Sequence, residues 1–232
     1  MSQRLWVRIG AVSGFVYVIL LIAGFAIGVA SAHTPPSIFG SPEQVASQIA
    51  QATPTGVWIG LYVEALALLC FVVFAAFLRT QAQLVERDVQ WPAAAAYGAG
   101  LIFASLQLLS MAILGIVSYR AGTGADVASA TALLDLRLGS YILSWSAGAL
   151  WIGLTAISAL RSGLLSRGLA VSGLLIALVW LASCLMPTSA IAQFWGFVPL
   201  LWTAVASISI MRRADQPRAM TSSGVLSPGT VS

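Results

Sequence analysis

The sequence predicts an all-α fold, a polytopic membrane helix bundle of about six transmembrane helices with both termini cytoplasmic. Of the 232 residues, 59% are hydrophobic and 8% are charged, whereas a soluble globular domain has roughly 45–50% apolar and about 25% charged residues. The apolar stretches are long and continuous, which favours helices over the alternating strands of a membrane barrel. The basic residues fall on alternate connections, as the orientation of membrane helices requires.

Each apolar stretch must supply about 20 residues to cross the bilayer. We expect one bundle over residues 1–213, with spans at about 9–32, 56–78, 92–118, 138–160, 168–186 and 193–211. The last two spans share one uncharged stretch, and a turn containing Pro187 separates them. Residues 214–232 are rich in Ser, Thr, Gly and Pro, which predicts a disordered cytoplasmic tail.

The first segment has an alternative interpretation as a cleaved signal peptide. Arg4 and Arg8 precede an apolar run that ends at Ala30, Ser31 and Ala32, which resembles a cleavage site. The apolar region of a signal peptide is about 7–15 residues long, whereas 24 uncharged residues follow Arg8 here. This length favours a retained helix.

The charges predict the orientation and the location. Nine of the eleven arginines lie in segments 1–8, 79–91, 161–167 and 212–232, and only Arg120 and Arg137 lie on the other side. This asymmetry places the nine in the cytoplasm. All basic residues are Arg, as in proteins of high-GC bacteria, so we expect a bacterial inner-membrane protein. The net charge of +4 forms no basic stripe, which argues against a nucleic-acid partner.

Two outer connections carry local signals. Ser41, Pro42 and Gln44 form the N-cap pattern of a short helix that should end near residue 52. The connection 119–137 should begin as coil and become helical near Asp126, extending the fourth span outward. We interpret its charges with His33 as a salt-bridged outer surface, formed by Arg120, Asp126, Asp135 and Arg137.

Small residues should mark the helix contacts, because lipid removes the hydrophobic force between helices. Small residues recur at a spacing of four on the first, third and fourth spans, and we expect these faces to meet. They are the pairs Gly10 and Gly14, and Gly24 and Gly28, on the first span; Ala96, Gly100 and Ala104 on the third; and Ser140, Ser144 and Gly148 on the fourth. An alternative for the first span is a homo-oligomer interface.

Glu64 is the leading candidate for chemistry. It lies about 12 Å inside the second span at 1.5 Å per residue, and Gly60, Ala67 and Phe71 share its helical face. A charge at the bilayer centre costs about 2.5–3.5 kcal/mol or more, and no basic residue lies within the predicted spans to pair with it. A neutral carboxyl in an apolar pocket is a good proton donor. The structural alternative is an interhelical hydrogen bond.

Other polar and aromatic side chains occur at a similar depth and could line an outer-half cavity. The candidate ligand-binding residues are Tyr62, Gln107, Tyr141, Ser144, Trp145 and Trp202. Interhelical hydrogen bonds and packing are the alternative roles for these residues. The sequence has one His and no metal-binding, nucleotide-binding or hydrolase motif, so we expect no metal and no cofactor.

Three stretches together resemble a group of small six-helix bacterial integral membrane proteins defined by a domain of unknown function. They are 40–45 (GSPEQV), 62–66 (YVEAL) leading to Phe74 and Leu78, and 162–165 (SGLL) before Gly173. This resemblance implies the fold alone, over about residues 8–212. Chain size and the buried Glu64 also resemble membrane-embedded terpene cyclases. That likeness implies Glu64 as a general acid, with Asp135 as a conjectured second acid.

These observations lead to one main hypothesis, that the protein binds a hydrophobic small molecule or lipid in an outer-half cavity around Glu64. One alternative is an isoprenoid cyclase that uses Glu64 as general acid. The others are a proton-coupled carrier and a regulatory membrane partner. Whether the protein is an enzyme is left open.

Overall fold

The computed structural model describes residues 3–31, 40–51, 53–84, 90–121, 127–186 and 196–215. Within these residues the chain is helical and has no strand, which confirms the predicted all-α class. The helices are α1 (Gln3–Ser31), α2 (Pro42–Gln51), α3 (Pro54–Gln83), α4 (Gln90–Ala121), α5 (Val127–Ser162), α6 (Arg167–Ser183) and α8 (Val198–Asp215).

Four helices, α1, α3, α4 and α5, are long and apolar enough to cross a membrane, with candidate spans of 27 to 35 residues. They coincide with the first four predicted spans. The last two predicted spans coincide with α6 and α8, which have 17 and 18 residues. Helices of that length rise only about 26 Å, against a hydrocarbon core of roughly 30 Å. The chain therefore forms a membrane-type bundle, and a count of six crossings stays a prediction.

The largest boundary difference is at α5, which begins at Val127 and not near 138. The expected outward extension of the fourth span is thus confirmed, and it carries Arg137 into the helix. The predicted tail 216–232 lies outside the described residues, as do His33 and Asp126.

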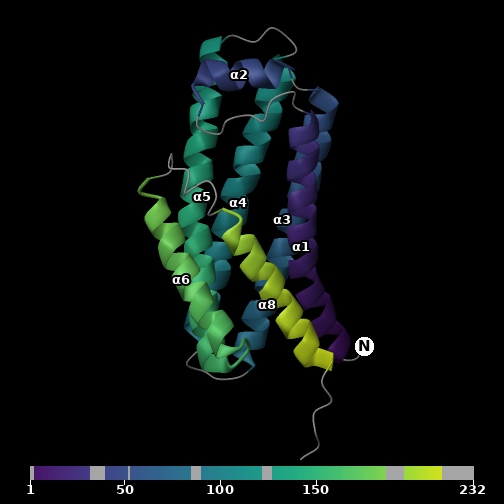
Figure 1. Ribbon diagram of the computed structural model, residues 1–232, viewed down its shortest axis with the longest axis vertical. Coiled ribbons are helices and arrows are strands. Elements are labelled where there is room, and N and C mark those ends of the chain that lie inside the picture. The colour runs from purple at the N-terminus through teal and green to yellow at the C-terminus, as the bar shows by residue number, and fades with distance from the viewer. Residues whose placement is uncertain are drawn as a thin grey trace, which may run out of the picture.

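The helix α2 lies across one end of the bundle and contacts α4 and α5 (Figure 1). Its predicted N-cap is confirmed by two reciprocal hydrogen bonds. The Ser41 N–H donates to Gln44 Oε1 at 3.1 Å, and the Gln44 N–H donates to Ser41 Oγ at 3.3 Å. Each bond satisfies an amide that the first helical turn leaves without a partner.

The other helices pack in a ring, in the order α1, α3, α4, α5, α6, α8 and back to α1 (Figure 1). The predicted small-residue faces of α4 and α5 meet, since Gln107, which shares the face of Gly100 and Ala104, donates a hydrogen bond to Ser144. The glycines of the first span face α3 instead, because Gly10 packs against Phe77 and Gly14 packs against Phe74. That face is filled within one chain, so a homo-oligomer through α1 would need another face and stays a prediction. The helix α1 packs on α3 and α8, and its retention stays a prediction.

An aromatic core fills the middle of the bundle. Phe71 is fully buried at its centre. Its ring centroid lies 5.1 Å from that of Tyr17, 5.3 Å from that of Phe103 and 4.6 Å from that of Trp151. Tilted and edge-on aromatic pairs at these separations are favourable beyond their buried area. This core is a packed support for the half that faces α2.

Candidate functional site

A cavity of about 550 Å³ occupies the half of the bundle nearer α2. Every described helix contributes to its wall, from Tyr17 of α1 to Thr203 of α8. The cavity exists because α6 ends at Ser183 and α8 begins at Val198, about midway along the bundle. The four long helices continue toward α2 without those two partners (Figure 1).

The cavity reaches the outer surface of the bundle beside α1 and the start of α8. Three of its lining residues are also about half exposed, namely Ile22 (52%), Phe25 (51%) and Phe197 (54%). The rings of Phe25 and Phe197 meet edge to face, with centroids 6.3 Å apart. In a bilayer this opening faces lipid, so an apolar molecule can enter from the side.

One face of α5 supplies the most chemically varied part of the wall. Arg137, Tyr141, Trp145 and Gly148 all line the cavity. Their spacing of four, four and three residues aligns them along one side of a helix. The rings of Tyr141 and Trp145 meet at 72° with centroids 5.3 Å apart.

Arg137 corrects two predictions. We expected it on a salt-bridged outer surface, and we expected no basic residue within the spans to accompany Glu64. Because α5 starts at Val127, Arg137 instead lies inside a spanning helix and lines the same cavity as Glu64. Its Nε is buried and has no hydrogen-bond partner among the described residues. A buried N–H donor without a hydrogen-bond partner is costly.

Glu64 lies where the sequence predicts, on the inward face of α3 with Gly60, Ala67 and Phe71. Its side chain packs over Gly24 of α1, where an added Cβ would lie 2.5 Å from Glu64 Cγ and 2.8 Å from the Gly60 carbonyl oxygen. The carboxyl and the Arg137 guanidinium interact electrostatically across the cavity. No direct ion pair joins them in the part of the chain that the structure describes.

A hydrogen-bonded chain joins α4 to α5 at the cavity wall. Gln107 Nε2 donates to Ser144 Oγ at 3.0 Å, and Ser144 Oγ donates to the Tyr141 carbonyl oxygen at 2.6 Å. Gln107 lines the cavity, as predicted from its helical face. Ser144 is fully buried behind the wall, so it orients Gln107 and has no surface for a ligand.

Besides Ser144, three predicted site residues do not line the cavity. Tyr62 is 65% exposed, because two residues along a helix from Glu64 is about 200° around its axis. Asp135 is exposed because it lies two residues before Arg137 and so points to the other side of α5. Trp202 of α8 is buried against α6, where its indole N–H donates to the Leu169 carbonyl oxygen at 2.9 Å. The conjectured second acid is therefore absent from this site.

Trp180 was not among the predicted ligand-binding residues, although its depth in the sequence allowed either packing or the wall of an aromatic pocket. It lines the cavity from α6 and packs on Gly148, where an added Cβ would lie 2.6 Å from the indole Cη2. Its Nε1 is buried without a hydrogen-bond partner within the described ranges. The sequence showed its depth but carried no signal for its neighbour.

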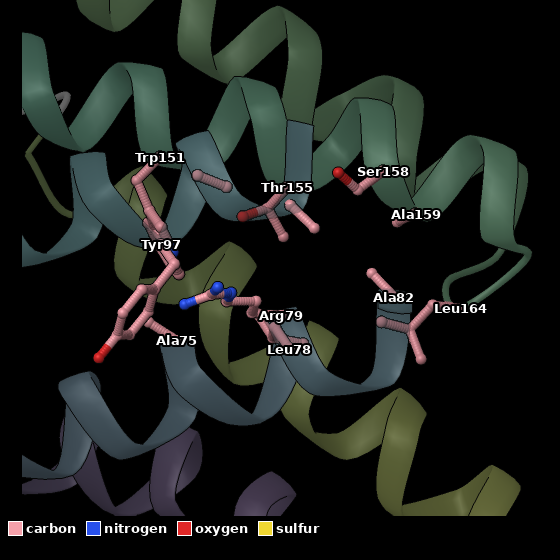
Figure 2. A pocket seen from close by; sticks show the side chains of 12 residues that line it. Ala75, Leu78, Arg79, Ala82, Tyr97, Trp151, Thr155, Ser158, Ala159 and Leu164 are labelled. Carbon is pink, nitrogen blue, oxygen red and sulfur yellow. The ribbon is translucent and has the colours of Figure 1, made fainter. Parts of the chain in front are cut away.

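A second cavity at the opposite end, shown in Figure 2, is far smaller, at about 10 Å³. Residues of α3, α4 and α5 line it, and the Arg79 guanidinium lies 5.3 Å from the centroid of the Tyr97 ring. That volume is about the least that holds one water molecule. This cavity is therefore too small for a ligand.

The described residues hold no cluster of three or more His, Cys, Asp and Glu side chains that could bind a metal ion. Comparisons with protein-family models, curated proteins and solved structures found no match for the chain. The resemblances drawn from the sequence therefore stay predictions, and the case for function comes from the cavity itself.

Proposed function

We propose that this protein binds a hydrophobic small molecule or lipid in the cavity around Glu64. The observation that carries the proposal is the cavity of about 550 Å³ with its opening beside α1. Ligand sites typically enclose about 300–1,000 Å³ behind mostly apolar walls with a few convergent polar groups. Here those polar groups are Glu64, Gln107, Arg137 and Tyr141.

The distribution of arginines supports an inner-membrane orientation with α2 outside. Arg8, Arg79, Arg161 and Arg212 all lie near the helix ends opposite α2 (Figure 1). Positive residues favour the cytoplasmic side. In this orientation the cavity opens to the outer leaflet, which supplies lipids and other apolar molecules directly.

Gly28 offers a direct way to fill the cavity. It lines the wall, and a Cβ added there would meet nothing within 4 Å. Gly28→Phe should therefore occupy the cavity without disturbing the helix contacts. Gly139→Phe is the matched control, because Gly139 has the same free space, is exposed and does not line the cavity.

The test is mass spectrometry of small molecules that copurify with each variant in mild detergent. We expect a defined apolar molecule with the wild type and with Gly139→Phe, and its loss from Gly28→Phe. Equal retention by all three proteins would place any bound lipid elsewhere and contradict the proposal.

An isoprenoid cyclase is a second candidate, favoured by the position of Glu64 beside aromatic rings. Phe103, Trp145 and Trp180 line the same cavity, and aromatic faces stabilise cations. With Asp135 outside the cavity, Glu64 would act as general acid without a second carboxyl. Conversion of added isoprenoid diphosphate by the wild type but not by Glu64→Gln would support catalysis, and its absence would leave binding alone.

The remaining alternatives predict other behaviour. A proton-coupled carrier predicts uptake into proteoliposomes that depends on a pH gradient and is lost in Glu64→Gln. A regulatory membrane partner predicts a copurifying protein that Glu64→Gln still retains. Neither behaviour follows from simple ligand binding, so these assays separate the hypotheses.

A further inference from the structure

We propose that the ligand is an anionic amphiphile whose carboxylate or phosphate headgroup binds the guanidinium of Arg137, while its apolar chain follows the α5 face past Trp145. This inference rests on the proposed function and specifies the class of molecule that the cavity takes.

The first argument is the missing partner of Arg137. Its Nε is buried without a hydrogen bond in the described part of the chain, and its side chain forms part of the cavity wall. A guanidinium presents five donors in a planar fork that matches a carboxylate or a phosphate. A buried charge is usually paired, and Glu64 interacts with Arg137 electrostatically without a direct ion pair, so the unsatisfied Nε donor can take an anion from outside the chain.

The depth of Arg137 fits a headgroup. Arg161, at the opposite end of α5, lies 24 residues further along the chain, which is about 36 Å at 1.5 Å per residue. The hydrocarbon core is roughly 30 Å thick. If Arg161 marks one membrane interface, Arg137 lies near the other, at the level where lipid headgroups reside.

The wall beyond Arg137 fits an apolar chain. Tyr141, Trp145, Gly148 and Trp151 follow on the same face of α5, and Trp151 lies 14 residues beyond Arg137, about 21 Å deeper. Gly148 leaves space that Trp180 enters from α6. Polar groups are therefore concentrated near α2, and aromatic groups lie toward the middle of the bundle.

Glu64 lies deeper in the cavity than Arg137, beside the proposed apolar chain of the ligand. Arg79 and Thr155 line one small cavity, so α3 and α5 are level there, and 15 residues back along each helix places Glu64 at the level of residue 140, next to Tyr141. That is roughly one helical turn, about 6 Å, deeper than Arg137. A negative charge there repels an anionic headgroup, so Arg137 and Glu64 should affect its binding in opposite directions.

The experiment measures binding of 9,10-dibromostearic acid and of the equivalent brominated alcohol in detergent micelles. Bromine quenches tryptophan, and Trp145 and Trp180 line the cavity. The variant Trp145→Phe/Trp180→Phe separates their signal from that of the other tryptophans, of which Trp151 also lines the cavity. The proteins compared are the wild type, Arg137→Gln, Arg137→Lys and Glu64→Gln. The matched control is Arg120→Gln, which removes a charge near the same end of the bundle but outside the cavity.

We expect Arg137→Gln to weaken binding of the acid roughly tenfold to a hundredfold, the scale of a hydrogen bond to a charged group. The alcohol should bind the wild type more weakly than the acid and should be insensitive to Arg137→Gln, which also shows that the variant is folded. Arg137→Lys should retain part of the affinity, Glu64→Gln should raise it, and Arg120→Gln should leave it unchanged. Dodecyl phosphate should displace the acid, and inorganic phosphate should not.

Equal affinities of the wild type for acid and alcohol, or an unchanged acid affinity in Arg137→Gln, would overturn the anionic headgroup while leaving an apolar cavity. Displacement by inorganic phosphate alone would show a free-anion site in place of an amphiphile site. If neither probe quenches Trp145 and Trp180 in the wild type, the proposed ligand cavity itself fails.

Discussion

The two halves of the bundle use the same four long helices but are filled differently. Around Phe71, aromatic rings from α1, α4 and α5 meet at centroid distances of 4.6 to 5.3 Å, and the space left beyond them is about 10 Å³. Toward α2 the same helices enclose about 550 Å³. The difference teaches that the short α6 and α8 close one half of the ring and leave the other half open.

Polar groups differ between the halves in the same way. Away from α2, Arg213 donates to the carbonyl oxygens of Gly163 and Leu164 at 2.6 and 3.0 Å. Toward α2, Arg137 has a buried Nε with no partner within the described residues. The half toward α2 therefore holds buried polar atoms without a partner among the described residues, as the proposed ligand site requires.

The largest expected contrast is in the cost of truncating apolar side chains. Phe71→Ala should lower the free energy of unfolding by about 3–5 kcal/mol, because it opens a cavity in close packing. Met111→Ala, on the cavity wall, should cost about 1 kcal/mol or less, because the side chain already borders empty space. Denaturation of each variant by a titrated ionic detergent measures both losses, and equal losses would remove the distinction between the halves.

Arg137→Leu should stabilise the ligand-free protein, by about 1–4 kcal/mol, since apolar replacement of poorly compensated buried charge is often favourable. Arg213→Leu should have the opposite sign, because it removes two hydrogen bonds to carbonyl oxygens. Thermal denaturation of delipidated samples gives the comparison. A marked loss of stability in Arg137→Leu would indicate that the guanidinium is a structural element of the bundle.

Two glycines of α1 sharpen the contrast within one helix. A Cβ at Gly24 would lie 2.8 Å from the Gly60 carbonyl oxygen, whereas one at Gly28 would meet nothing within 4 Å. Gly24→Ala should therefore destabilise the protein by about 1–3 kcal/mol through overpacking, and it should displace Glu64. Gly28→Ala should be neutral or slightly stabilising, because Ala is the better helix former. The midpoint temperatures of the two variants would be similar if α1 and α3 were not in close contact.

The smallest expected effect is a pH dependence of α2, which lies across the open half. Two hydrogen bonds to the Glu43 carboxylate hold its pKa below the ordinary value. The larger effect comes from a backbone N–H and the smaller from the Ser41 side chain. The ionised Glu43 carboxylate therefore stabilises the folded helix fully above its unfolded-state pKa. This stabilisation is lost as the pH falls through the pKa of Glu43 in the folded state. The protection factors of the α2 amides, which correct for the pH dependence of intrinsic exchange, should fall on acidification in the wild type. Glu43→Gln should abolish that fall, and an unchanged profile would contradict the assignment.

Sequence reasoning succeeded where a helical period or a local motif was sufficient. The spacing of Glu64 with Gly60, Ala67 and Phe71 predicted its inward face, and the spacing of Gln107 with Gly100 and Ala104 did the same. The Ser41 and Gln44 pattern predicted both capping bonds. These features depend on residues near one another in the chain, so periodicity and capping rules describe them well.

Sequence reasoning failed where an answer required a helix end or a neighbouring helix. Hydropathy ended the fourth span at its first charge, so Arg137 was placed in a connection. Continuing the four-residue period back from Trp145 and Tyr141 would have placed it on the cavity face. Tyr62 and Trp202 were expected near the cavity from depth alone. Depth fixes the level of a side chain but not its direction around the helix.

The measurement that tests the central claim most directly is a crystal structure of the protein grown from a lipid phase. We expect elongated density between Trp145 and Trp180, with one end within hydrogen-bond distance of Arg137 and the other near the middle of the bundle. A structure in which side chains collapse into this space, with Arg137 paired directly to Glu64, would contradict the account, because the chain would then satisfy its own buried charges and leave no room for a ligand.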